Sequence, residues 1–188
     1  MRKFKLVFYL LIIVFYSSNF LSAQELVPSD FQVRKSITFE KFKIRKLTVS
    51  DAAKDYNAIM SSIEHLKGNT FGPKSNWLKK ELTLKQDSID LKWHEDEFDN
   101  RSSFAYAVTD LKDLKIIGCV YIFKPKYEEY DATLYMWVTK EEFDKGLDEI
   151  LYREIKNWID KKWPFKNPAY PGREIVWTEW YAKDKSKN

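Results

Sequence analysis

The feature that most constrains the fold is the run at residues 116–123, Ile-Ile-Gly-Cys-Val-Tyr-Ile-Phe, which is apolar almost throughout. A strand with apolar side chains on both faces belongs in the middle of a sheet that is covered on both sides, so we expect helices on both faces of this sheet. Residues 104–108 and 133–138 are also strand-like, and short connectors join them to the central run. The three segments therefore predict an antiparallel meander.

Two helices are predicted between an early strand and this meander. Residues 42–47 are strand-like, and Ser50 or Asp51 can cap a helix whose apolar positions continue to Ile63. Residues 83–98 form the second predicted helix, with apolar groups at intervals along it. A strand followed by helices is thus the first predicted unit.

A further helix and a last strand are predicted after the meander. Residues 147–159 place their apolar side chains on one helical face, and residues 174–180, Glu-Ile-Val-Trp-Thr-Glu-Trp, are strand-like. Because a helical crossover joins parallel strands, we expect residues 174–180 to run parallel to residues 133–138. The predicted fold class is α+β, with a mixed, mostly antiparallel twisted sheet and helices on both faces.

The N-terminus has the three parts of a secretory signal peptide. Residues 1–5 carry three positive charges, residues 6–16 are an unbroken apolar run, and a short segment rich in small residues ends at Ala23. The run is shorter than the roughly 20 apolar residues that a membrane-spanning helix needs. We therefore expect cleavage before Gln24 and export to the periplasm or the medium, with a membrane-anchored or cytoplasmic protein as the alternative.

The rest of the chain is the size of one domain. We expect an N-terminal arm at residues 24–41, a single domain at residues 42–182 and a charged tail at residues 183–188. Of the 32 basic residues three lie in the leader, which leaves 29 against 28 acidic residues, interspersed along the chain. This balance predicts no nucleic-acid partner, and contact with a membrane only through the leader.

Signatures of metal and hydrolytic sites are missing from the sequence. His94 and Glu97 share a helical face as a metal or acid/base pair would, but a solvated helix surface is the favoured interpretation because His65 is the only other histidine. No metal is expected. The lone Cys119 excludes an internal disulfide and is most simply a small buried apolar residue.

Four phrases along residues 42–180 carry a resemblance to a known family: Arg45-Lys-Leu-Thr-Val-Ser-Asp51, Phe104-Ala-Tyr-Ala-Val108, Ile117-Gly-Cys-Val-Tyr-Ile122 and Tyr135-Met-Trp-Val138. In this order they resemble segments of the GCN5-related N-acetyltransferases, the GNAT enzymes. Three other phrases look like an uncharacterised branch of that family: Arg101-Ser-Ser-Phe-Ala-Tyr106, Trp163-Pro-Phe165 and Ala169-Tyr-Pro-Gly-Arg-Glu174.

The resemblance implies transfer of an acetyl group from acetyl-CoA, as co-substrate, to an amine on a small molecule or a peptide. It places Met136, Trp137 and Val138 along the pantetheine arm, with the Val138 N–H available to the thioester oxygen. It places Lys145, Gly146 and Leu147 at the pyrophosphate, where a helix N-terminus offers free N–H groups.

The pyrophosphate loop departs from the family pattern. Of the glycines of that pattern only Gly146 is present, and Glu141, Glu142 and Asp144 bring negative charge to the approach of a diphosphate. The neighbouring Lys140 and Lys145 are the groups that can compensate this charge.

Residue type alone nominates the remaining site residues. Glu179 is the candidate base for the amine, and Tyr152 or Tyr170 the candidate acid for the leaving thiolate. The aromatic candidates for substrate binding are Trp77, Tyr106, Trp177 and Trp180. A second hypothesis is an exported, non-catalytic module that keeps the GNAT-like fold and binds a small ligand or a peptide.

Overall fold

The structure, a computed structural model, describes residues 25–78 and 81–184, so the predicted leader lies outside the described residues. Its six strands form one sheet in the order β1-β2-β3-β4-β5-β6. The strands are β1 (Ser36–Thr38), β2 (Lys43–Lys46), β3 (Phe104–Thr109), β4 (Ile116–Phe123), β5 (Ala132–Val138) and β6 (Pro168–Ala169). The helices are η1 (Val49–Asp51), α1 (Ala52–Met60), α2 (Ile63–Leu66), α3 (Leu84–Asp99), α4 (Lys140–Asp144), α5 (Leu147–Lys162) and α6 (Trp177–Ala182).

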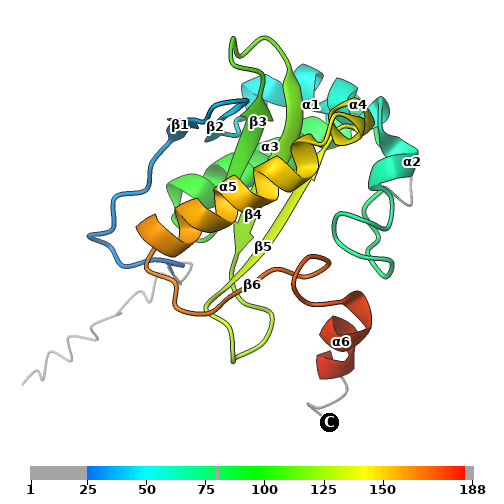
Figure 1. Ribbon diagram of the computed structural model, residues 1–188. Helices are drawn as coiled ribbons and strands as arrows, with labels where there is room; N and C mark the ends of the chain where they lie inside the picture. Colours follow the sequence, from blue (N-terminus) through cyan, green and yellow to red (C-terminus); the bar gives the residue numbers. More distant parts are fainter. Residues whose placement is uncertain (1–24, 79–80, 185–188) are drawn as a thin grey trace, which may run out of the picture.

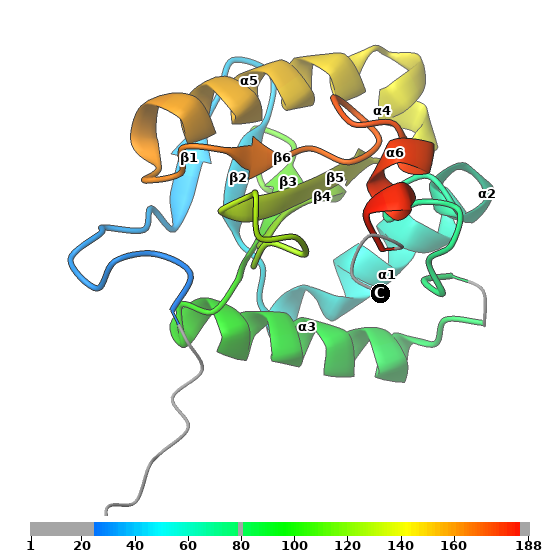
Figure 2. The ribbon, with the colours of Figure 1, turned by 90° about the horizontal axis from the view of Figure 1, so that it is seen from below.

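The sheet lies between two helical layers, as the apolar central run predicts. Figure 2 shows α5 along one face, and α1 and α3 along the other. In the α5 layer Leu151 and Ile155 are fully buried, and in the opposite layer Ile59 and Leu91 are 2% exposed. Each helix thus buries its apolar stripe against one face of the sheet, which is what an amphipathic helix requires. The predicted α+β class is confirmed.

The predicted antiparallel meander is confirmed, because β4 pairs with β3 on one side and with β5 on the other. Strand β4 pairs antiparallel with β3 through Val120 and Tyr106, and antiparallel with β5 through Val120 and Met136. Gly118 faces Val138 at the end of β5, and a Cβ at Gly118 would stand 2.1 Å from the Trp137 carbonyl oxygen. Only glycine therefore fits at this point of close backbone approach.

The prediction of a last strand at residues 174–180 is wrong. The parallel partner of β5 is β6, which pairs through Ala132 with Pro168 and through Thr133 with Ala169. The chain then turns at Gly172, whose φ is +78°, and leaves the sheet before α6 begins. The apolar residues that follow lie at helical spacing and pack in one cluster: Trp177, Trp180 and Tyr181.

Near the N-terminus the structure agrees with the prediction in one detail and differs in another. Asp51 is the N-cap residue of α1, as predicted, while its side chain closes a capping box on the preceding turn η1 by accepting the N–H of Thr48 at 3.0 Å. The predicted helix to Ile63 is interrupted, because α1 ends at Met60 and α2 starts anew.

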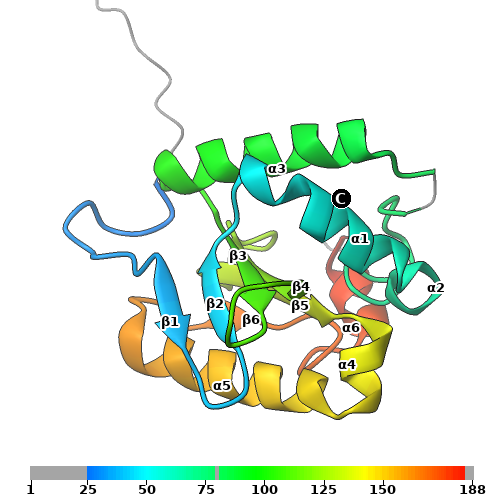
Figure 3. The same ribbon diagram turned by 90° about the horizontal axis from the view of Figure 1, so that it is seen from above.

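The segment expected as an arm contributes to the sheet. Strand β1 pairs antiparallel with β2 through Ile37 and Ile44, and Val27 is 3% exposed in the α5-side core. Figure 3 shows β1 at one side of the molecule, with α2 and α6 at the other. No helix among the described residues is long and apolar enough to cross a membrane.

Candidate functional site

A cleft opens where β5 and β6 stop pairing. After Thr133 the two strands diverge, and Figure 1 shows the chain beyond β6 turning away toward α6. A cavity of about 340 Å³ lies at this opening. Its lining comes from α2 and the following loop, from β5, from α4 and α5, and from the segment after β6: His65, Leu66, Asn69, Thr70, Leu134, Tyr135, Met136, Trp137, Val138, Phe143, Asp148, Pro171, Gly172, Arg173 and Trp177. Segments far apart in the sequence thus build one site.

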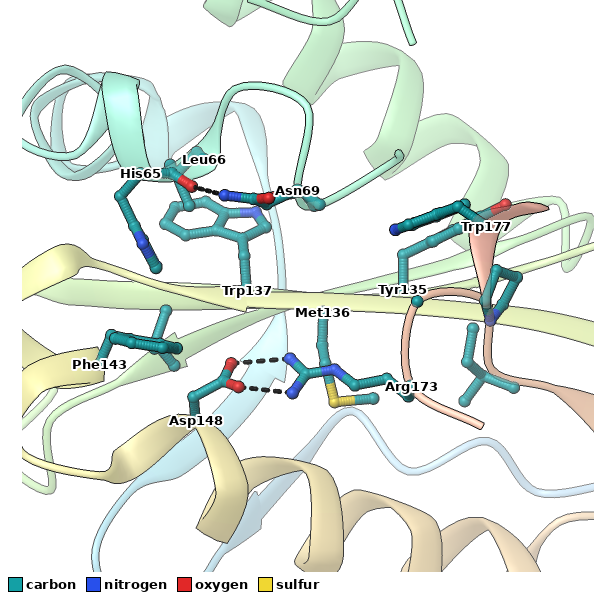
Figure 4. Close-up of a pocket in the computed structure, with 15 residues that line it drawn as sticks. His65, Leu66, Asn69, Tyr135, Met136, Trp137, Phe143, Asp148, Arg173 and Trp177 are labelled. Atoms are coloured by element: carbon teal, nitrogen blue, oxygen red, sulfur yellow. Dashed lines mark hydrogen bonds and ion pairs between the residues drawn. The ribbon is translucent and has the colours of Figure 1, made fainter. Parts of the chain in front are cut away.

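Strand β5 divides the cleft into two sides. Side chains alternate along a strand, so Met136 belongs to the α5-side core whereas Trp137 belongs to the opposite core. Figure 4 shows Asp148 and Arg173 on the side of Met136, and His65 with Trp137 on the other side. A ligand between the strands would therefore meet a charged pair on one side and an aromatic wall on the other.

The backbone of β5 faces the opening with alternate peptide groups. The Thr139 N–H donates to the Ile117 carbonyl oxygen at 2.9 Å, so the N–H of Thr139 points toward β4. Because successive residues direct their N–H groups to opposite edges, the N–H groups of Met136 and Val138 point toward the side from which β6 has diverged. These two donors are thus available to an extended ligand in the cleft.

An ion pair crosses the cleft on the α5 side. The guanidinium of Arg173 donates two hydrogen bonds to the Asp148 carboxylate, one of them at 2.7 Å. Their side chains are only 14% (Asp148) and 23% (Arg173) exposed, and Asp148 lies in the first turn of α5. The N-cap of α5 is Gly146, at φ +79°, and no side chain caps the helix. The start of α5 therefore has free N–H groups beside the ion pair of the Asp148 carboxylate and the Arg173 guanidinium.

His65 projects into the cleft from α2. Its ring packs against Phe143 at 4.6 Å between centroids, and the Asn69 amide donates to its carbonyl oxygen at 2.6 Å. Burial lowers the pKa of the imidazole, Asp148 acts in the opposite direction, and Lys140 lowers the pKa further. His65 is therefore neutral at pH 7 and can accept a proton.

Trp177 closes one end of the cleft between two glycines. A Cβ on Gly72 or on Gly172 would stand 2.7 Å from an atom of its indole ring, and both glycines have left-handed backbones. The ring also lies parallel to that of Tyr135, 6.4 Å away between centroids. Two loops from different parts of the chain thus hold one aromatic side chain at the cleft.

The acids of α4 are paired with lysines. Lys145 contacts Glu141 at 2.5 Å and Glu142 at 3.0 Å, and Lys140 contacts Asp144 at 2.5 Å. The negative charge that the sequence places near a diphosphate is therefore largely balanced within this short helix.

The structure brings several of the predicted site residues together. Met136, Trp137, Val138 and Trp177 line the cleft. The predicted pyrophosphate residues Lys145, Gly146 and Leu147 lie beside it, where α4 ends and α5 begins. Trp77 lies behind the cleft wall, in contact with the rings of Phe71 and Trp137.

Two of the aromatic candidates are core residues. Tyr106 is fully buried and donates its hydroxyl to the Arg34 carbonyl oxygen at 2.9 Å. Trp180 is 1% exposed and packs against Tyr127 at 4.6 Å between ring centroids. Neither ring faces the cleft, because each fills the interior of its own cluster.

The three candidate catalytic residues lie outside the cleft lining. Glu179 is exposed on α6, and Tyr152 donates its hydroxyl to Glu174 at 2.8 Å. Tyr170 is fully buried, and the described residues offer its hydroxyl no hydrogen-bond partner. Burial is the main cause that raises the pKa of both tyrosines above its usual range, which makes each a weaker acid.

His94 and Cys119 belong to the packing of the second core. His94, expected on a solvated surface, is partly buried against the Tyr121 ring at 5.2 Å, and this burial lowers its pKa to about 4. Cys119 is fully buried, as the sequence predicts, and its thiol donates to Asp55 at 3.3 Å. Among residues 25–78 and 81–184 no three His, Cys, Asp or Glu side chains gather to hold a metal ion.

Three polar residues of the cleft were not predicted from the sequence. His65, Asp148 and Arg173 come from α2, α5 and the turn after β6, and only tertiary packing brings them together. Two signals exist in the sequence: Asp148 stands near a predicted helix start, where an acid is common, and Arg173 belongs to the phrase at residues 169–174 that carries the family resemblance.

Comparisons with known proteins define the fold. No protein-family model matches the sequence, and no curated protein matches it. A ribosomal-protein-S5-alanine acetyltransferase from Vibrio fischeri has a TM-score of 0.53 and 21% identity, over 67% of this chain and 67% of that chain. A "probable acetyltransferase" has a TM-score of 0.58 and 14% identity, over 72% of each chain. RimL, a ribosomal L7/L12 alpha-N-protein acetyltransferase solved with coenzyme A, has a TM-score of 0.51 and 8% identity, over 65% of this chain and 66% of that chain. The acetyltransferase fold implied by the sequence resemblance is thereby confirmed.

Proposed function

We propose that this protein, which has the fold of the GNAT acetyltransferases, transfers an acetyl group from acetyl-CoA to a primary amine. The observation that carries the proposal is the cleft between the diverging β5 and β6, with two free β5 N–H donors and the start of α5 at its side. The likeness to RimL, a structure solved with coenzyme A, supports coenzyme A as the ligand of such a cleft.

The residues of the cleft fit an acyl-CoA. The N–H groups of Met136 and Val138 offer hydrogen bonds to the amides of a pantetheine arm, as a neighbouring strand would receive them. Arg173 and the free N–H groups at the start of α5 offer positive charge and donors to a diphosphate. The negative charge of Asp148 opposes a diphosphate. Arg173 therefore has to release the Asp148 carboxylate before it can bind the diphosphate.

The two sides of β5 separate the two substrates. The acyl donor belongs on the α5 side, with Arg173, and the acceptor amine belongs on the side of Trp137, Tyr135 and Trp177. The Val138 N–H, directed into the opening, would stabilise negative charge on the carbonyl oxygen during attack. In this arrangement the chain orients both reactants and excludes water, while the thioester supplies the reactive carbonyl.

A second function is a non-catalytic ligand-binding module, and one observation favours it. The Asp148 carboxylate already occupies the position of an anion beside Arg173 and the α5 N-terminus. A cleft closed in this way would suit a small ligand held against the aromatic wall rather than an acyl-CoA.

Calorimetric titration with acetyl-CoA tests the proposal. Saturable binding, followed by release of free thiol when an amine is added, is the result expected of an acetyltransferase. Phenylethylamine and the peptide Ala-Ala-Ala serve as acceptor probes, and mass spectrometry detects the acetylated product. Saturable binding without thiol release from any acceptor would favour the binding module, and no binding at all would overturn the acyl-CoA assignment.

A further inference from the structure

His65 stands between the cleft and a second hollow. This hollow, about 400 Å³ in volume, lies over α2 and the end of α1, and its lining is Met60, Ser61, Ser62, Ile63, Glu64, His65 and Lys140. Among the described residues, His65 is the one that lines both this hollow and the cleft. Its side chain therefore borders both spaces.

The position of His65 is fixed from two directions. Ser62, the N-cap residue of α2, accepts the Lys140 N–H through its hydroxyl at 2.8 Å, which ties α2 to α4. The Asn69 amide bonds the His65 carbonyl oxygen, and Phe143 of α4 packs against the imidazole. Figure 4 shows the ring directed toward the cleft between Trp137 and Phe143. The imidazole is thus presented on a supported turn rather than on a loose loop.

The charges around His65 leave it as a base. Burial lowers the pKa of its imidazole most, Lys140 lowers it too, and Asp148 and Asp144 act against this. The other titratable groups of the cleft are unsuited to accept a proton. Asp148 is held by Arg173, and burial raises the pKa of Tyr135 to about 12. Among the cleft-lining residues His65 is therefore the free neutral base at pH 7.

We propose that His65 is the general base for the acceptor amine, which enters from the hollow over α2; this inference rests on the proposed acetyltransferase function. The amine nitrogen forms a bond to the thioester carbonyl carbon as its proton moves to an imidazole nitrogen of His65. The carbon–sulfur bond then breaks, and the departing thiolate takes the proton back from the imidazolium. The amide and the free thiol are the products, and the histidine returns to its neutral form.

Proton NMR of the full chain tests, without turnover, whether a molecule bound in the cleft lies near His65. The chain has two histidines, so His65→Gln and His94→Gln assign both imidazole signals. Coenzyme A is the probe, and it should shift the His65 signal and leave the His94 signal in place. If calorimetry shows binding while the His65 signal and its titration stay unchanged, the inference is overturned and the acetyltransferase proposal stands. If calorimetry shows no binding, the proposed function and this inference fall together.

Kinetics of the same variants test the proton transfer. With acetyl-CoA and the two acceptor probes, His65→Gln should lower kcat by about 100-fold or more, because general bases contribute on that scale. The acidic limb of the pH–rate profile should disappear, while the affinity for coenzyme A, which controls for folding, stays near that of the wild type. His94→Gln is the matched control and should keep the rate and the profile. A full rate with an unchanged acidic limb in His65→Gln would overturn the assignment.

Discussion

Arg173 and Asp148, which are 25 residues apart in the sequence, face each other across the cleft and form a two-point ion pair. Such fork-shaped contacts are strong because both bonds are charge-assisted and the guanidinium is planar. Here the carboxylate lies where an incoming diphosphate would meet the start of α5. Under the proposed function, the pair therefore opposes acyl-CoA binding in the resting protein.

The first prediction is that Asp148→Asn tightens the binding of coenzyme A. The substitution removes one negative charge and releases Arg173 for the diphosphate. One unit charge at close range in water is equivalent to about 1 kcal/mol, so we expect about fivefold tighter binding. The gain should shrink as salt is added, because salt screens exposed charges. Calorimetry at low and high ionic strength measures it.

Glu149→Gln is the matched control for this change. Glu149 is the next residue of α5, is exposed and carries the same charge, but does not line the cleft. It should alter the affinity much less than Asp148→Asn does. Arg173→Gln should weaken binding. Equal affinities for Asp148→Asn and the wild type at low salt would contradict this role of the ion pair.

The second prediction concerns a buried carboxyl pair between α1 and α3. Asp55 and Asp87 are 2% and 3% exposed and hydrogen-bonded to each other, and Asp55 also accepts the Cys119 thiol. Burial raises the pKa of Asp55 to about 6 and that of Asp87 to about 7, and Asp51 and Asp90 add to this. The folded protein therefore binds more protons than the unfolded chain between about pH 4 and pH 7, and the free energy of unfolding falls as pH rises through that range.

Asp55→Asn tests this pH dependence. It removes one titrating group and keeps an oxygen that can accept the Cys119 thiol. Between about pH 5 and pH 8 the wild type should lose about 1–3 kcal/mol of unfolding free energy relative to the variant. Denaturant unfolding at both pH values gives the difference, and Asp30→Asn, an exposed carboxylate, is the control. A difference between wild type and Asp55→Asn that is independent of pH would show that the pair does not titrate in this range.

The fold could be predicted wherever one periodic pattern decided the structure. The apolar run of β4 fixed the centre of the sheet, and the stripe from Leu147 fixed α5. The end of the chain could not be predicted, since residues 174–180 alternate like a strand while Trp177, Trp180 and Tyr181 also fit a helix. The true partner, β6, is two residues long and begins with a proline, too short to show any alternation.

The site could be predicted only in part, for a related reason. Met136 and Val138 follow from the family resemblance, and the structure places them beyond the point where β5 and β6 stop pairing. Packing of α2 and of the turn after β6 brings His65 and Arg173 to the cleft. No fixed spacing between the two residues in the sequence indicates this. Glu179 was nominated by residue type, and its helix α6 presents that side chain to solvent.

The third prediction concerns the leader, which lies outside the described residues. Its charged start, apolar run and small-residue end are typical of a cleaved signal peptide. Protein isolated from its native cell should therefore begin at or near Gln24, and intact-mass measurement with fractionation tests this. A soluble cytoplasmic protein that retains Met1 to Ala23 would contradict the expected export. It would also place the cleft in a compartment where acetyl-CoA is made.

The last prediction is that Gly172→Ala disrupts the cleft more than Gly68→Ala does. Both glycines have left-handed backbones, with φ values of +78° and +76°, so each substitution has a similar backbone cost of roughly 1–2 kcal/mol. The added methyl group differs in what it meets. At Gly172 it would stand 2.7 Å from the Trp177 ring, and at Gly68 its nearest neighbour is a Pro73 backbone atom at 3.8 Å. Gly172→Ala should therefore displace Trp177, raise the KM for the phenylethylamine acceptor and change the tryptophan fluorescence, whereas Gly68→Ala should reduce stability alone. Equal KM values for the acceptor in the two variants would show that Trp177 does not shape the acceptor side of the cleft.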